Sequence, residues 1–157
     1  MATIKKKPSG YGQFGGFSPY GNVTALAFFL ATNASGAVID SDTTVAVASG
    51  DVIDLGELPE GMRLDDAQIL IKTGMTATVT GSLGFKYVDG DSTEVPQDAA
   101  YFINAGDLAT AGRLRANTGK LVTLPKAARL ILTTGVAANA KASDIKVIVS
   151  GELKGPR

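Results

Sequence analysis

Short apolar runs separated by turn residues make up most of the chain after residue 22. In several runs apolar and polar positions alternate, as at Ile145, Val147 and Val149, which is the pattern of a strand with one buried face. β-Branched residues are frequent in these runs and favour strands. The predicted strands cover residues 23–30, 43–48, 51–55, 67–73, 75–80, 83–88, 120–124, 129–134 and 145–153.

The breaks between these runs carry turn-forming residues, such as the Asn33–Gly36 tetrapeptide and Asp89-Gly90-Asp91. Strands at this spacing, with no amphipathic helices between them, predict an all-β fold, an antiparallel β-sandwich of jelly-roll type. Residues 95–115 are ambiguous. Pro96 could open a helical turn over residues 99–104, while Gly106 and Gly112 disfavour anything longer. We therefore predict at most one short helix.

The first 21 residues differ from the rest of the chain. They contain five Gly, two Pro and four aromatic residues that recur every three positions, a composition that opposes helix and long strand. We predict an extended arm over residues 1–21 and a single sandwich domain over residues 22–157. Aromatic side chains bury much area with few rotors, so the arm is predicted to bind a partner. The predicted partner-binding residues are Lys5, Lys6, Lys7, Tyr11, Phe14, Phe17 and Tyr20.

The composition excludes several kinds of chemistry. The 157 residues include no Cys and no His, so the chain has no thiolate nucleophile, no disulfide and no Ser-His-Asp triad. We predict a non-catalytic protein with no cofactor. The formal net charge is zero, which argues against nucleic acid as a partner. No apolar run approaches the ~20 residues of a membrane span, so we expect no membrane partner.

The zero net charge conceals separate blocks. Residues 40–107 carry a net charge of −10, residues 108–157 carry +7, and the first 21 residues carry +3. Two interpretations stay open at this point. The segments can interleave in the fold and cancel locally, or they can form complementary faces that meet a partner.

Clusters of charged residues suggest sites, but each has a simpler explanation. Asp40, Asp42, Asp51 and Asp54 could in principle bind Ca²⁺, yet the EF-hand pattern is absent and acids beside turn glycines are usual. Asp65 and Asp66 are adjacent in the sequence, and adjacent residues of a strand point to opposite faces, which a carboxylate pair for glycoside hydrolysis does not permit. A helix N-cap or a solvated edge explains them better. We predict no metal and no catalytic residue. The best basic patch consists of Arg113, Arg115, Lys120, Lys126 and Arg129, and an ordinary solvated face explains it.

One order of motifs resembles a known family. The segments are LGELPEGMRL at 55–64, AQILIKT at 67–73, TVTGSLG at 78–84, ARLILTTG at 128–135 and ASDIKVIV at 142–149. Together they resemble capsid decoration (cement) proteins and related head accessory proteins of tailed bacteriophages, over about residues 50–151.

The resemblance implies a function. A protein of this kind is made in the host cytoplasm, joins the virion at the capsid surface, binds the outside of the major capsid protein lattice and stabilises the head. It also implies a homo-oligomer, most often a trimer, with arms that reach across subunits. The alternatives are another virion component, such as a head fibre base or tail protein, and a carbohydrate-binding β-sandwich module. The absence of Trp, a common sugar-stacking side chain, counts against the module.

Overall fold

The computed structural model describes residues 1–5 and 23–154. These residues contain no helix, and so none long and apolar enough to cross a membrane. The strands are β1 (Thr3–Lys5), β2 (Val23–Thr32), β3 (Val52–Leu58), β4 (Met62–Thr73), β5 (Thr80–Tyr87), β6 (Asp98–Asp107), β7 (Gly112–Arg115), β8 (Val122–Thr123), β9 (Ala128–Gly135) and β10 (Ser143–Leu153).

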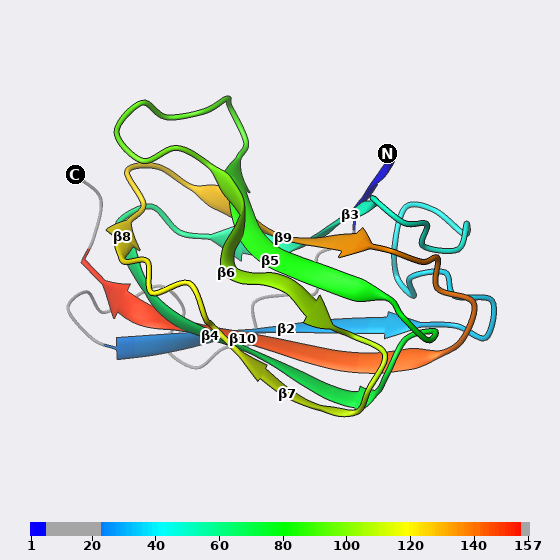
Figure 1. Ribbon diagram of the computed structural model, residues 1–157. Coiled ribbons are helices and arrows are strands. Elements are labelled where there is room, and N and C mark those ends of the chain that lie inside the picture. The colour runs from blue at the N-terminus through cyan, green and yellow to red at the C-terminus, as the bar shows by residue number, and fades with distance from the viewer. Residues whose placement is uncertain (6–22, 155–157) are drawn as a thin grey trace.

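The strands form two sheets that pack as layers (Figure 1). The first sheet has the order β1-β3-β9-β5-β6, and the second has the order β2-β10-β4-β7, with β8 beside β4. All strand pairs are antiparallel except β1 with β3. The predicted all-β sandwich is confirmed.

The core lies between the layers and follows the alternation seen in the sequence. Ile145, Val147 and Val149 of β10 all point inward and are fully buried. Phe85 of β5 lies at the centre of an aromatic group, with its ring 5.3 Å from that of Tyr101 in an edge-to-face arrangement. Burial of these side chains is the main source of stability in a sandwich of this kind.

The possible helical turn over residues 99–104 is wrong, because this stretch lies within strand β6. Its residues Tyr101, Phe102 and Ile103 are all buried, and the strand pairs with β5. Aromatic and β-branched side chains suit a strand, and their place in the core outweighs the helix-start signal at Pro96.

Two predicted strands are also wrong. Residues 43–48 form only an isolated bridge between Ala46 and Ala37. Val45 is 69% exposed while Val47 is buried, so the two valines do not share a buried face as the alternation suggested. In residues 75–80 the backbone of Thr78 has φ +68°, in the left-handed region. It forms a turn there, and the strand begins only at Thr80.

The connections gather at two ends of the sandwich. Four loops, residues 33–51, 74–79, 108–111 and 136–142, each cross from one sheet to the other. The strand register brings them to one end, since Thr80 pairs with both Gly135 and Asp107. We call this the crossover end, which lies on the right in Figure 1. The loops 59–61, 88–97, 116–121 and 124–127 lie at the opposite end.

Candidate assembly surfaces

Only one residue of the predicted partner-binding set is described. Lys5 is exposed at the end of β1, where its N–H donates to Asp42 Oδ1 at 3.0 Å and its carbonyl accepts from the Asp42 N–H at 3.0 Å. The remaining residues, Lys6, Lys7, Tyr11, Phe14, Phe17 and Tyr20, lie outside the described residues. Their role in binding a partner remains a prediction.

The first five residues belong to the first sheet. Strand β1 pairs in parallel with β3, and Ile4 is buried. The N–H of Ala2 donates to Asp51 Oδ1 at 2.9 Å, while the other carboxylate oxygen accepts from the N–H of Ala48 at 2.9 Å. The start of the predicted arm is therefore held on the β3 edge by a buried carboxylate.

These contacts also account for the aspartates considered as calcium ligands. Asp51 is used by the backbone of two segments, and the buried Asp54 accepts from Arg129 Nε at 3.0 Å. Among the described residues no group of three or more carboxylates could hold a metal ion.

The acidic and basic segments interleave, so the first interpretation of the charge pattern is confirmed. Ion pairs join the two segments at Lys72–Asp144, Arg63–Glu152, Arg115–Asp66, Lys120–Asp98, Lys126–Asp89 and Arg129–Asp54. Four of the five residues in the candidate basic patch thus have acidic partners. The exposed pairs among them contribute little to stability, but they remove a continuous basic surface.

Asp65 and Asp66 lie on the same face of β4, so the prediction that they point to opposite faces is wrong. A bulge shifts the register here, because Ser150 pairs with Asp66 while Gly151 pairs with Leu64, which leaves Asp65 as the extra residue. The two carboxylates have different partners. Arg63 binds Asp65 and lowers the pKa of that carboxyl through a hydrogen bond, and Arg115 binds Asp66. Each carboxylate is thus held by an arginine of its own, and the two do not form a pair.

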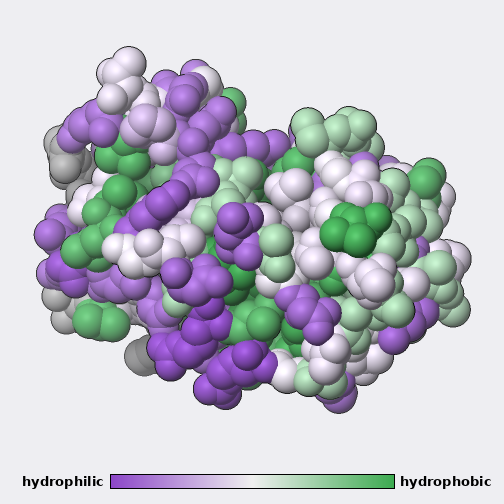
Figure 2. Space-filling view, viewed as in Figure 1, coloured by the Kyte–Doolittle hydropathy of each residue, from purple (hydrophilic) through white to green (hydrophobic). Residues whose placement is uncertain are grey.

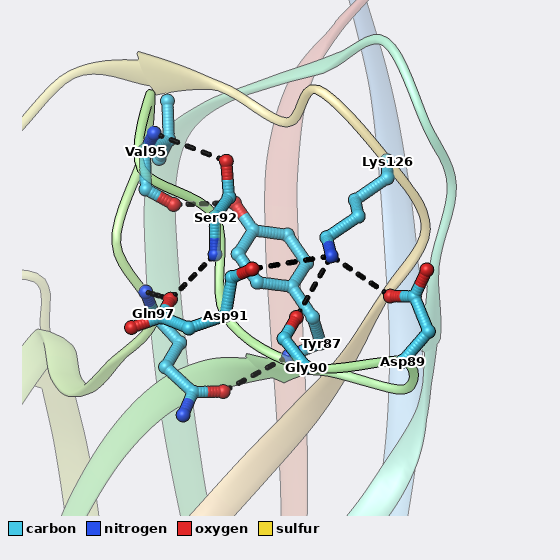
Figure 3. A network of polar contacts seen from close by, with 8 residues as sticks. All are labelled: Tyr87, Asp89, Gly90, Asp91, Ser92, Val95, Gln97 and Lys126. Atoms are coloured by element: carbon cyan, nitrogen blue, oxygen red, sulfur yellow. Dashed lines mark hydrogen bonds and ion pairs between the residues drawn. The ribbon is translucent and has the colours of Figure 1, made fainter.

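At the opposite end, Lys126 organises the long loop of residues 88–97 (Figure 3). Its ammonium group donates to the carbonyl of Gly90 at 2.8 Å, pairs with Asp89 at 2.9 Å and lies 4.9 Å from the centre of the Tyr87 ring. The Asp91 carboxylate accepts from the N–H groups of Ser92 and Gln97, and these bonds lower the pKa of the Asp91 carboxyl. The polar groups of this loop thus serve to hold its shape.

Two shallow hollows are present on the described surface. One, of about 560 Å³, lies at the crossover end and includes Asp107 and Lys141 in its lining. The Thr110 hydroxyl and the Ala109 N–H lower the pKa of the Asp107 carboxyl, so it stays ionised near neutral pH. The other, of about 490 Å³, lies beside Tyr101, where burial raises the pKa of the phenol to about 12. Neither group is suited to proton transfer at neutral pH.

The four loops of the crossover end have few charges and several exposed apolar side chains, while Asp107 and the Lys72–Asp144 pair are exposed at the strand ends beside them. Its four loops contain Asp40, Asp42, Asp51 and Lys141 as their charged residues, and Asp51 is buried. Figure 2 shows pale and green residues over much of this end and a concentration of purple, hydrophilic residues at the other. The large apolar side chains exposed in these loops belong to Ile39, Val45 and Val136.

A buried polar network joins the loops of the crossover end. The amide of Asn139, 1% exposed, donates to Thr32 Oγ1 at 3.0 Å and to the carbonyl of Lys141 at 2.9 Å. Its oxygen accepts from the N–H of Thr76 at 3.0 Å. Thr32 Oγ1 also lies 2.8 Å from Ser143 Oγ. The N–H of Asn139 donates to the Val47 carbonyl at 2.8 Å, so the network connects three of the four crossover loops. A buried network whose members are satisfied makes a surface rigid.

The same end contains an exposed residue with a strained backbone. Val136 has φ +68° and is 73% exposed. It is the central residue of a three-residue turn in which the Ala137 N–H donates to the Gly135 carbonyl at 2.9 Å. A β-branched residue in this region costs about 1–3 kcal/mol and persists where the surroundings impose it. Strain of this kind often accompanies function.

Comparison with solved structures places this fold among capsids. The chain matches one from the capsid of Ralstonia phage GP4 with a TM-score of 0.62, 19% identity and coverage of 88% of both chains. This protein therefore has a fold that is found in phage capsids. A chain of the cyanophage Pam1 capsid matches with a TM-score of 0.58, 18% identity and coverage of 94% of this chain and 97% of that one.

A chain from the acid-stable capsid of the Helicobacter pylori bacteriophage KHP30 matches with a TM-score of 0.52, 14% identity and coverage of 85% of this chain and 94% of that one. No family model and no curated protein matches the sequence. The phage-capsid fold therefore agrees with the resemblance to phage virion proteins, and the chain spans nearly the whole of each structure that it matches.

Proposed function

We propose that the chain is a non-catalytic structural protein of a phage virion, a decoration protein that binds the outside of the major capsid protein lattice and stabilises the head. The observation that carries the proposal is its likeness to a chain of the Ralstonia phage GP4 capsid over 88% of both chains. The ionised or paired state of the acids described above supports a structural role rather than hydrolysis.

Simple physics connects such a protein to head stability. Packaged DNA presses outward on the capsid, so binding energy added between subunits opposes rupture. Attachment as a homo-oligomer, for which we favour a trimer, turns several weak contacts into firm binding through effective concentration. The predicted arm would add contact area on a neighbouring subunit, at an entropic cost for ordering it.

Binding to heads tests the function directly. We expect the purified protein to co-sediment with heads of the encoding phage from which the protein has been deleted, and to raise the temperature at which those heads release DNA. Cryo-electron microscopy should place it on the outer capsid surface. Density only at the tail or at a fibre base would contradict decoration, and binding to a glycan array without binding to heads would favour the carbohydrate module.

The predicted role of the arm has its own test. Replacing Tyr11, Phe14, Phe17 and Tyr20 together with Ser should weaken attachment to heads at least tenfold, because the aromatic contacts are lost. We expect the melting temperature to stay near that of the wild type, because the predicted role of these four residues is to bind a partner and not to build the core of the domain. Substitution is preferable to deletion of residues 1–21, which would also remove the buried Ile4.

The matched control is the pair of substitutions Val88→Ser and Leu121→Ser. Both side chains are exposed at the opposite end. Their replacement makes the surface more polar and leaves the sequence of the arm unchanged. Attachment of the arm variant at the strength of this control would contradict the predicted role of the arm.

A further inference from the structure

We infer that the crossover end is the surface through which copies of this chain contact one another. The inference rests on the proposed function, in which the protein joins its own copies on a particle. The partner of the crossover end is then a second copy of the chain. It depends on the charge pattern, the exposed apolar residues and the backbone strain of the four crossover loops.

The charge pattern favours contact between identical surfaces. A residue at a symmetry axis lies next to its own copies, because the same surface patch meets itself there, so a charged residue at the axis meets the same charge and is repelled. The crossover loops expose only Asp40, Asp42 and Lys141 as charged residues. The loops of the opposite end carry six charged residues, four of them acidic, including Asp89 and Asp91. Copies meeting at that end would bring carboxylates together.

The apolar residues and the rigidity of the crossover end suit an interface. The centres of protein interfaces are depleted of charge and enriched in apolar side chains, as here with Val45 and Val136, which are 69% and 73% exposed. The Asn139 network holds the loops in place before any partner binds. A surface ordered in advance loses little entropy on association.

The strain at Val136 points in the same direction. Gly or Asn would occupy the left-handed conformation at a lower cost, and an exposed valine gains nothing from the core of its own chain. A contact between copies gives the side chain a role, because it would then be buried on assembly. The strained turn presents the valine outward from the end of β9.

A pair of matched substitutions tests the inference. Val136→Asp and Val88→Asp each replace an exposed valine with a carboxylate. Val136, at the crossover end, is 73% exposed, and Val88, at the opposite end, is 71% exposed. Asp tolerates a positive φ better than Val, so Val136→Asp should fold at least as well as the wild type. Sedimentation equilibrium of the full chain from 1 to 100 µM should show self-association of the wild type and of Val88→Asp. For Val136→Asp the dissociation constant should rise at least tenfold.

Further measurements separate charge repulsion from the loss of an apolar contact. Val136→Asn keeps the tolerance of positive φ without the charge and should associate more strongly than Val136→Asp. At 1 M salt, where charges more than about 3 Å apart are screened, the difference between these two variants should shrink. A wild type that stays monomeric at 100 µM, or equal loss of association in Val136→Asp and Val88→Asp, would overturn the inference.

Attachment to heads distinguishes this inference from the proposed function. If the wild type self-associates and Val136→Asp does not, but neither binds heads, the proposed function fails and the contact at the crossover end stands. If the wild type binds heads but is monomeric in solution at every concentration tested, the inference fails and the decoration function stands.

Discussion

Replacing Asn139 with alanine should lower the free energy of unfolding by about 1–3 kcal/mol, the cost of leaving the Thr76 N–H without its acceptor. The Lys141 carbonyl still accepts from Thr32 Oγ1 at 2.9 Å. The substitution removes the acceptor of the Thr76 N–H and the donor to the Lys141 carbonyl. It also removes the donor to Thr32 Oγ1, which is buried. Urea denaturation followed by circular dichroism measures the change, provided that the slope with denaturant stays the same.

A second asparagine supplies the control. Asn104 is exposed on β6 and meets Ser82 Oγ only at 3.5 Å, so Asn104→Ala should change the stability by less than about 0.5 kcal/mol. Similar losses in the two variants would show that the Asn139 network does not hold the crossover loops together. We also expect Asn139→Ala to weaken self-association, because the loops then lose their fixed shape.

Replacing Gly151 with alanine should destabilise the fold by about 3 kcal/mol or more, beyond the usual cost of overpacking. Gly151 lies in β10 at the bulge opposite Leu64. A Cβ atom there would lie 1.8 Å from the carbonyl oxygen of Arg63. That oxygen belongs to the backbone of the neighbouring strand, so relief requires the two strands to separate. Thermal melting should show a large decrease, or a failure to recover folded protein.

The neighbouring residue provides the comparison for Gly151. Ser150 lies beside the same bulge and is half-buried, so Ser150→Ala changes the same strand without the steric clash. We expect a change of less than about 1 kcal/mol for this control. A melting temperature for Gly151→Ala close to that of Ser150→Ala would mean that the bulge adjusts easily.

The sequence predicted those strands whose apolar periodicity agrees with their place in the fold. Ile145, Val147 and Val149 alternate in the sequence and point into the core. The pattern failed where the backbone departs from extended geometry. Residues 75–80 look like a strand, but the left-handed Thr78 forms a turn. The helix-start signal at Pro96 also failed, because the residues after it form strand β6. Burial of the aromatic side chains of β6 decides the structure there.

The crossover end was not found from the sequence because it is made of four loops that are far apart in the chain. Each loop alone contains mostly small and turn-forming residues, which are typical of any β-protein. A signal was present in the absence of charge from two of the four loops and its low content in the others, but only the strand register brings the loops together. The charge blocks were visible in the sequence, whereas their ion pairs depended on the order of the strands.

The position of β10 has a consequence for the order in which the protein folds. It is the last strand of the described chain, yet it lies inside the second sheet, where Glu152 pairs with both Val23 and Arg63. Strand β2 therefore cannot pair along its full length until β10, which ends about 120 residues after β2, has been translated. We expect the second sheet to form only after β10 has been synthesised, at the slow rates typical of non-local strand pairing.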